Sequence, residues 1–319
     1  MIPAPEFVVS GDGTRIAVEA VGAGPPLVIT TGALQGRAGV RLLAQALADR
    51  FTVHVWDRRG RGDSGGVPDP ALDPLGPDGE TLVAAEVADL AAVVEHAGAG
   101  HAGGEHAGGG HAGGGHAGGG HAGSGHAGGG HAAPAHYAHS AGAVLALEAV
   151  MRGVPAGRVV AHEAPWRVGG ADADGRRDLA VATMTALREG RDDDAAAAFL
   201  GGFPAAAPAP VERLRTTPFW AGTVALAPSL PHDVALVTRD VLPAARLAGL
   251  SVPLLALDGA ASPAWVRDAI AALAAAVPGA EHRTMPGQEH FVVPAVLAPV
   301  VAEYLEGGAA VRGSVGGGR

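Results

Sequence analysis

Short apolar runs alternate with longer segments of helical periodicity along most of this 319-residue chain. A hairpin pattern at residues 6–22 is followed by strand patterns at 25–32 and 51–56, with helix patterns between and after them. The alternation resumes at residue 134 and again at residue 251. Strands that alternate with helices form a mostly parallel sheet covered by helices on both faces. The sequence therefore predicts an α/β fold with a sheet of about eight strands.

One long segment departs from this alternation. Residues 167–250 read as Ala-rich helices with Pro breaks, which is typical of a helical lid inserted after the sixth strand. The predicted organisation is an α/β core (1–98, 133–166 and 251–308), a flexible repeat loop (99–132), the lid (167–250) and a disordered tail (309–319).

Histidine recurs at a five-residue period at His96, His101, His106, His111, His116, His121, His126, His131 and His136. The Gly and Ala residues between them offer little apolar surface to bury, so we expect a flexible loop. This loop joins the amino end of the fifth strand, whereas active sites in parallel sheets lie at the carboxyl ends. We expect adventitious binding of divalent metals to this array and no role for it in catalysis.

Composition excludes several classes of function. The net charge of −10 disfavours binding to nucleic acid or to an anionic membrane, because basic clusters neutralise phosphates. The absence of cysteine excludes a thiolate nucleophile and a thiolate zinc site. No basic start with an apolar run opens the chain, and no charge-free stretch reaches the length of a membrane span. We expect a cytoplasmic protein that acts on a small molecule without a cofactor.

A candidate nucleophile lies between the fifth strand and the next helix. The pattern Ala138-His139-Ser140-Ala141-Gly142 fits a sharp strand-to-helix turn that exposes the serine hydroxyl and needs small neighbours. Ala138 stands where such turns usually have glycine. The same residues also fit an ordinary helix start with a serine cap.

Three further motifs favour the first interpretation, and with them the chain resembles the α/β-hydrolase family from about Glu6 to Gly308. Residues 57–64 (DRRGRGDS) are similar to that family's turn after the fourth strand, and residues 30–33 (TTGA) to its turn after the third. Residues 287–290 (GQEH) lie in the loop where the family has its general base. The resemblance implies that Ser140 is the nucleophile and His290 the base, with an oxyanion hole at the amides of Ala33 and Ala141.

The acid of the triad is less clear from the sequence. Many relatives carry an Asp in a Gly-x-x-Asp turn after the seventh strand, and aligning residues 259–263 to that turn puts Ser262 at this position. Two other carboxylates are available: Asp258 at the end of the seventh strand and Glu163 after the sixth. We favour Glu163, because the chain resembles haloalkane dehalogenases in this arrangement.

A serine at the turn implies an acyl-enzyme route, so the leading hypothesis is a serine esterase-like hydrolase of esters, lactones or similar acyl bonds. Phe199, Phe203, Phe219 and Trp220 in the lid suggest an apolar substrate. The alternatives are a cofactor-free perhydrolase of the same fold and a His-rich metal-binding protein with an inactive hydrolase body.

Overall fold

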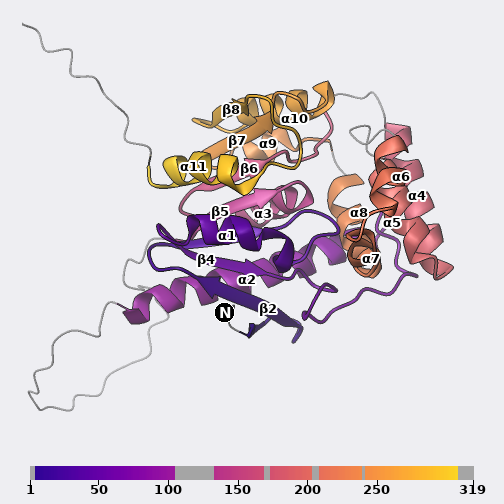
Figure 1. The fold of residues 1–319 in the computed structure, drawn as a ribbon, viewed down its shortest axis with the longest axis horizontal. Coiled ribbons are helices and arrows are strands. Elements are labelled where there is room, and N and C mark those ends of the chain that lie inside the picture. The colour runs from indigo at the N-terminus through magenta and orange to yellow at the C-terminus, as the bar shows by residue number, and fades with distance from the viewer. Residues whose placement is uncertain (1–3, 105–132, 169–172, 203–207, 239–240, 308–319) are drawn as a thin grey trace, which may run out of the picture.

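The computed structural model describes residues 4–104, 133–168, 173–202, 208–238 and 241–307. An eight-stranded sheet with the order β1-β2-β4-β3-β5-β6-β7-β8 runs through its centre (Figure 1). The pairs β1–β2 and β2–β4 are antiparallel, and the five remaining pairs are parallel. The strands are β1 (Glu6–Val9), β2 (Arg15–Val21), β3 (Pro26–Thr30), β4 (Thr52–Trp56), β5 (Ala135–His139), β6 (Val159–His162), β7 (Leu254–Gly259) and β8 (Glu281–Met285). The predicted mostly parallel sheet is confirmed.

Helices cover both faces of this sheet, which explains why its central strands are almost continuously buried. One face packs against α1 (Arg41–Leu47) and α11 (Pro294–Leu305), with the short helix η1 (Arg37–Val40) preceding α1. The other face packs against α2 (Asp78–Gly104), α3 (Ala141–Met151) and α10 (Ala264–Ala276).

A helical region lies between β6 and β7, and its helices α4 to α8 form the lid on the right of Figure 1. Its helix α8 packs against α2 and α3, and its last helix α9 packs against α10, so both helices join this region to the core. The predicted lid after the sixth strand is confirmed. Its elements are α4 (Ala173–Arg188), α5 (Asp192–Gly201), α6 (Pro208–Arg215), α7 (Trp220–Val224), η2 (Ala227–Ser229), α8 (Leu230–Thr238) and α9 (Ala244–Leu247).

The histidine array begins and ends in regular structure. His96 lies on α2, which continues to Gly104, past residue 99 where the sequence predicts the loop to begin, and His136 lies within β5. Adding residues to an existing helix costs less than starting a new one, because the first turn is already formed. Residues 105–132 and the predicted tail lie outside the described residues. Among the helices in the described ranges, none is long and apolar enough to cross a membrane.

Several buried histidines lie on the central strands. His54 on β4, His136 on β5 and His162 on β6 are at most 5% exposed. Burial disfavours the charged imidazolium and lowers the pKa of each of these side chains to about 4. All three are therefore neutral near pH 7.

The stability of the fold should therefore depend on pH. In the unfolded chain a histidine titrates near pH 6.5, so below that pH the unfolded state binds more protons than the folded state. The free energy of unfolding should be highest above pH 6.5 and fall toward pH 4, by up to about 1.4 kcal/mol per pH unit for each histidine. Urea unfolding between pH 4.5 and 7 measures this slope. His136→Leu should flatten it by one histidine's share, and an unchanged slope would contradict the assignment.

Candidate active site

Ser140 occupies a sharp turn between β5 and α3. Its backbone has φ 55° and ψ −127°, a left-handed conformation that costs energy for any residue other than glycine. The amide of Ser140 donates to the carbonyl of His162 at 2.8 Å, which fixes the turn to the end of β6. The serine side chain is thereby held at the carboxyl edge of the sheet, where it is partly exposed.

Two glycines allow the end of β3 to approach this turn. A Cβ atom at Gly142 would lie 2.4 Å from the carbonyl oxygen of Thr31. A Cβ atom at Gly32 would lie 3.0 Å from the Cβ of Ser140. Ala138, in place of the usual glycine, is fully buried in β5. The loop after β3 therefore lies directly against the serine.

The amide of Ala141, directly after Ser140, and that of Ala33, in the loop whose Gly32 lies against Ser140, are the candidate hydrogen-bond donors. Ala141 is the first residue of α3, and the first N–H groups of a helix have no acceptor within it. Within the described part of the chain, the amide of Ala33 donates to no protein acceptor. Backbone N–H groups of this kind can stabilise an oxyanion.

His290 lies in the loop between β8 and α11, and its side chain is 31% exposed. Its Nδ1 atom is 2.6 Å from Oε2 of Glu163, which directly follows β6 and has φ 50°. Gly259 allows this loop to approach the end of β7, because a Cβ atom there would lie 2.3 Å from the carbonyl oxygen of Gln288. The Ser140 and His290 side chains are not hydrogen-bonded to each other in the described structure, and such contacts often tighten only around substrate.

The second oxygen of Glu163 is also bonded. Its Oε1 accepts the amide of Gly259 at 3.0 Å and the hydroxyl of Ser262 at 2.5 Å. Burial raises the pKa of Glu163, but the hydrogen bonds from His290 and Ser262 outweigh it, so the pKa lies below its usual value. Ser262, at the position where many α/β hydrolases have Asp, thus supports the carboxylate of Glu163.

Asp258 lies elsewhere. It is fully buried in β7, and its Oδ2 is 3.0 Å from Nε2 of His282 on the neighbouring strand β8. In the described structure Asp258 makes no hydrogen bond to His290. Of the two candidate acids, Glu163 is the one in contact with this histidine.

The sequence interpretation missed two histidines beside the site. His139 and His162 directly precede Ser140 and Glu163, and the His139 ring lies 4.4 Å from that of His290 and 5.0 Å from that of His162. Burial, together with the neighbouring histidines, holds the pKa of His139 well below its usual value. Its Nε2–H therefore donates, as a neutral ring, to the carbonyl oxygen of His290 at 3.0 Å. Their positions next to the two candidate residues were the available sequence signal.

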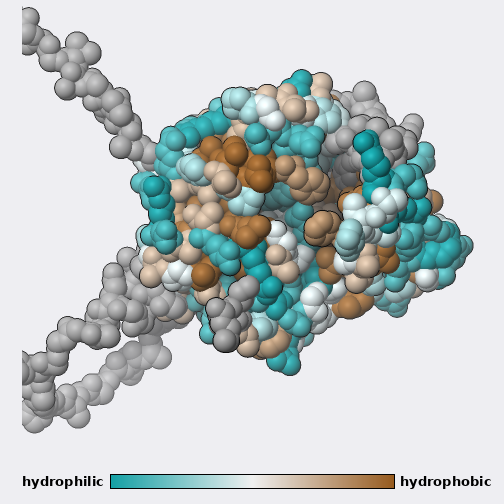
Figure 2. Space-filling model, viewed as in Figure 1, coloured by the Kyte–Doolittle hydropathy of each residue, from teal (hydrophilic) through white to brown (hydrophobic). Residues whose placement is uncertain are grey.

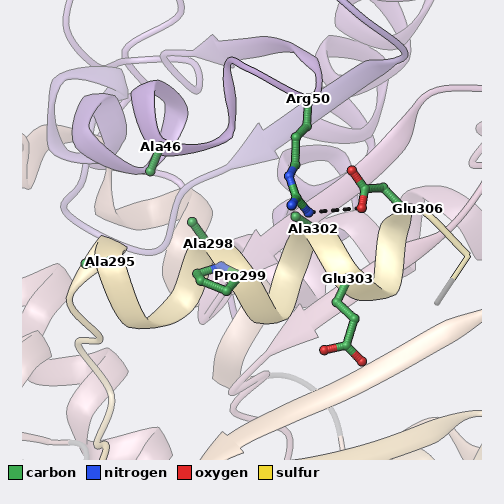
Figure 3. Close-up of a pocket in the computed structure, with 8 residues that line it drawn as sticks. All are labelled: Ala46, Arg50, Ala295, Ala298, Pro299, Ala302, Glu303 and Glu306. Atoms are coloured by element: carbon green, nitrogen blue, oxygen red, sulfur yellow. Dashed lines mark hydrogen bonds and ion pairs between the residues drawn. The ribbon is translucent and has the colours of Figure 1, made fainter. Parts of the chain in front are cut away.

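A groove of about 600 Å³ lies away from this site, between α1 and α11. Figure 3 shows alanines and Pro299 along it, with an ion pair between Arg50 and Glu306 at 3.0 Å. The polar residues that line it are Arg50, Glu303 and Glu306, and none of Ser140, His290 and Glu163 is among its lining residues. Among the residues that the structure describes, no cluster of three or more metal-ligating side chains is present.

No protein-family model and no curated protein sequence matches the chain. Solved structures do. An α/β hydrolase from Sphaerobacter thermophilus DSM 20745 is 35% identical with a TM-score of 0.75, and the match covers 94% of this chain and 100% of that one.

Two esterase structures share the fold at lower identity. One, from Rhodococcus sp. ECU1013, is 18% identical with a TM-score of 0.62 over 95% of this chain and 99% of that one. The other, from Thermogutta terrifontis, is 19% identical with a TM-score of 0.62 over 96% of this chain and 97% of that one. The 35% identity to the Sphaerobacter hydrolase, over 94% of this chain, shows that the chain belongs to the α/β-hydrolase family.

Proposed function

We propose that this protein is a serine hydrolase that cleaves an ester, lactone or similar acyl bond of a small, apolar substrate through an acyl-enzyme. The observation that best supports this is the 2.6 Å contact between His290 and Glu163 beside the strained turn that carries Ser140. A serine hydroxyl becomes an effective nucleophile when a base removes its proton, and the base works when a carboxylate fixes its tautomer.

In the first half of the reaction, Oγ of Ser140 attacks the carbonyl carbon while Nε2 of His290 takes the hydroxyl proton. The carboxylate of Glu163 accepts the Nδ1–H of His290 and stabilises the imidazolium that forms. The amides of Ala33 and Ala141 donate to the oxyanion, and each such donor typically lowers the barrier by about 3 kcal/mol. The tetrahedral adduct collapses, and the leaving alkoxide takes the proton from His290.

In the second half, His290 removes a proton from water, and the hydroxide attacks the acyl carbon bound to Ser140. The same two amides hold the second oxyanion. Collapse breaks the bond to Oγ, which recovers its proton from His290, and the carboxylic acid leaves. Glu163 stays ionised in both halves, consistent with its lowered pKa.

The surface around the site supports an apolar substrate. Figure 2 shows hydrophobic surface over the beginning of α11, beside a hollow between the core and the lid. Phe291 is 68% exposed, and its ring lies 5.0 Å from that of His290. Of the four lid aromatics named from the sequence, Phe199 and Trp220 are buried within the lid and Phe219 is exposed. Residue 203 lies outside the described ranges. The apolar surface beside His290 therefore comes from Phe291 and not from the described lid aromatics.

A fluorophosphonate probe tests the proposed function. The wild-type protein should be modified once, at Ser140, and should hydrolyse p-nitrophenyl esters of short acyl chains. Ser140→Ala should abolish labelling, and Ser140→Ala and His290→Ala should each lower kcat by at least about 10⁴-fold with the fold intact, because triad members act as a unit. Mass spectrometry measures the labelling, steady-state ester hydrolysis measures kcat, and circular dichroism shows whether the fold is intact. An unlabelled Ser140 in a folded protein that binds zinc tightly would support the metal-binding alternative instead.

The acid is tested by a pair of carboxamide substitutions. Glu163→Gln should lower kcat by about 10³- to 10⁴-fold with little change in KM, because the histidine loses the partner that fixes its tautomer. Asp258→Asn, in which the new amide oxygen can still accept from His282, should change kcat by less than about threefold. Steady-state kinetics of both variants measures this ranking, and the reverse ranking would assign the role to Asp258.

The position of Ser262 allows a rescue experiment for the role of Glu163. Glu163→Ala removes the acid, and adding Ser262→Asp in the same chain supplies a carboxylate within reach of the vacated position, since the Ser262 hydroxyl already contacts Glu163. The double variant should recover at least about tenfold of the kcat lost in Glu163→Ala. No recovery in a folded double variant would mean that Glu163 acts other than as the partner of His290.

A further inference from the structure

Four charged side chains form a fully buried cluster between the core and the lid. Arg58 and Arg61 come from the turn after β4, Glu86 from α2 and Asp233 from the lid helix α8. Arg58 pairs with Glu86 at 2.5 Å, and both arginines pair with Asp233, at 2.8 and 2.6 Å. Two positive and two negative charges cancel, which makes their common burial possible.

Arg61 extends from this cluster to the loop after β3. Its Nη1 donates to the carbonyl oxygen of Gly32 at 2.6 Å and to that of Gln35 at 3.0 Å. The same loop is closed by the hydroxyl of Thr31, which donates to the carbonyl of Gln35 at 3.0 Å. Two carbonyl groups of the loop are thus held by one guanidinium.

The bond to Gly32 has a direct consequence for Ala33. Because the peptide unit is planar and trans, the carbonyl of Gly32 and the N–H of Ala33 point in opposite directions. With the carbonyl held by Arg61, the Ala33 N–H points away from the guanidinium. Gly32 itself lies against Ser140.

The orientation of the Gly32–Ala33 peptide must be fixed by a hydrogen bond from outside the loop. Gly32 has no Cβ atom, so its backbone can rotate at low cost, and Leu34 on the other side already has φ 52°. A rotated peptide would present a carbonyl oxygen where the oxyanion requires a donor.

Arg61 is in turn held by the lid. Its Nε donates to the hydroxyl of Ser229 at 3.1 Å, and its Nη2 to Oδ2 of Asp233 at 2.6 Å. Ser229 ends η2 and Asp233 lies in the helix that follows. The orientation of the guanidinium therefore depends on both the core turn and the lid.

We propose that Arg61 is a positioning residue for the oxyanion hole, which fixes the Gly32–Ala33 peptide so that the Ala33 N–H faces Ser140, with Ser229 and Asp233 of the lid fixing Arg61. This rests on the proposed serine-hydrolase function. It gives the motif at residues 57–64, which the sequence analysis matched to the family's turn after the fourth strand, a part in positioning the oxyanion hole.

Arg61→Lys tests the proposal, with Arg59→Lys as the matched control. Arg59 lies in the same turn, is 6% exposed and pairs with Asp89 at 2.6 Å, but none of its hydrogen bonds reaches the loop after β3. Both substitutions remove a buried guanidinium and keep a charge. Arg61→Lys should lower kcat by about 10²-fold, the effect of losing one oxyanion donor, with KM changed less than threefold. Arg59→Lys should keep kcat within threefold of the wild type.

A second readout separates positioning from general damage to the structure. A boronic acid that forms a tetrahedral adduct on Ser140 should bind about 10²-fold more weakly to Arg61→Lys and unchanged to Arg59→Lys. Equal effects of the two variants on kcat and on boronate affinity would overturn the proposal. If Arg61→Lys does not fold, Ser229→Ala removes only the hydroxyl on Nε and should lower kcat about three- to tenfold, whereas an unchanged kcat would overturn the proposal.

The two hypotheses fail differently. Absence of ester hydrolysis and of Ser140 labelling in the wild type would refute the serine-hydrolase function and the role of Arg61 with it. Normal wild-type hydrolysis with an Arg61→Lys variant as active as Arg59→Lys would refute only the role of Arg61.

Discussion

The register of three neighbouring parallel strands determines where the candidate site forms. Thr30 of β3 pairs with Ala138 of β5, and His139 pairs with His162 of β6. All three strands end within about one residue of this level, so the loops that follow them leave the sheet side by side. The proposed oxyanion loop, nucleophile and acid follow these strand ends directly, so strand pairing alone brings them close together.

Much of this arrangement could be predicted from the sequence. The alternation of strand and helix patterns predicts the sheet, and the loss of alternation after residue 166 predicts the lid. Ser140 and His290 could be selected because each lies in a loop at a recognisable place in the strand order. These are local properties, which a single sequence displays directly.

The two candidate acids differ in a property that a sequence does not display. Asp258 is still within β7, and the alternation of side chains along that strand directs it toward His282. Glu163 is the first residue after β6, and its positive φ takes it out of the alternation and toward His290. In the sequence, each of the two residues is simply a carboxylate at the end of a predicted strand. Likewise, the contact between Arg61 and Gly32 joins residues 29 positions apart, and no periodicity predicts it.

Three residues other than glycine have positive φ in the described structure: Leu34, Ser140 and Glu163. One lies in each of the three loops at the candidate site. Such conformations cost of order 1–3 kcal/mol each, against a typical net stability of 5–15 kcal/mol for a folded domain. These three backbone conformations destabilise the folded state, and the packing of the sheet and the lid must offset this cost. A search for thermostable variants would therefore tend to select glycine at these positions, the proposed nucleophile Ser140 among them.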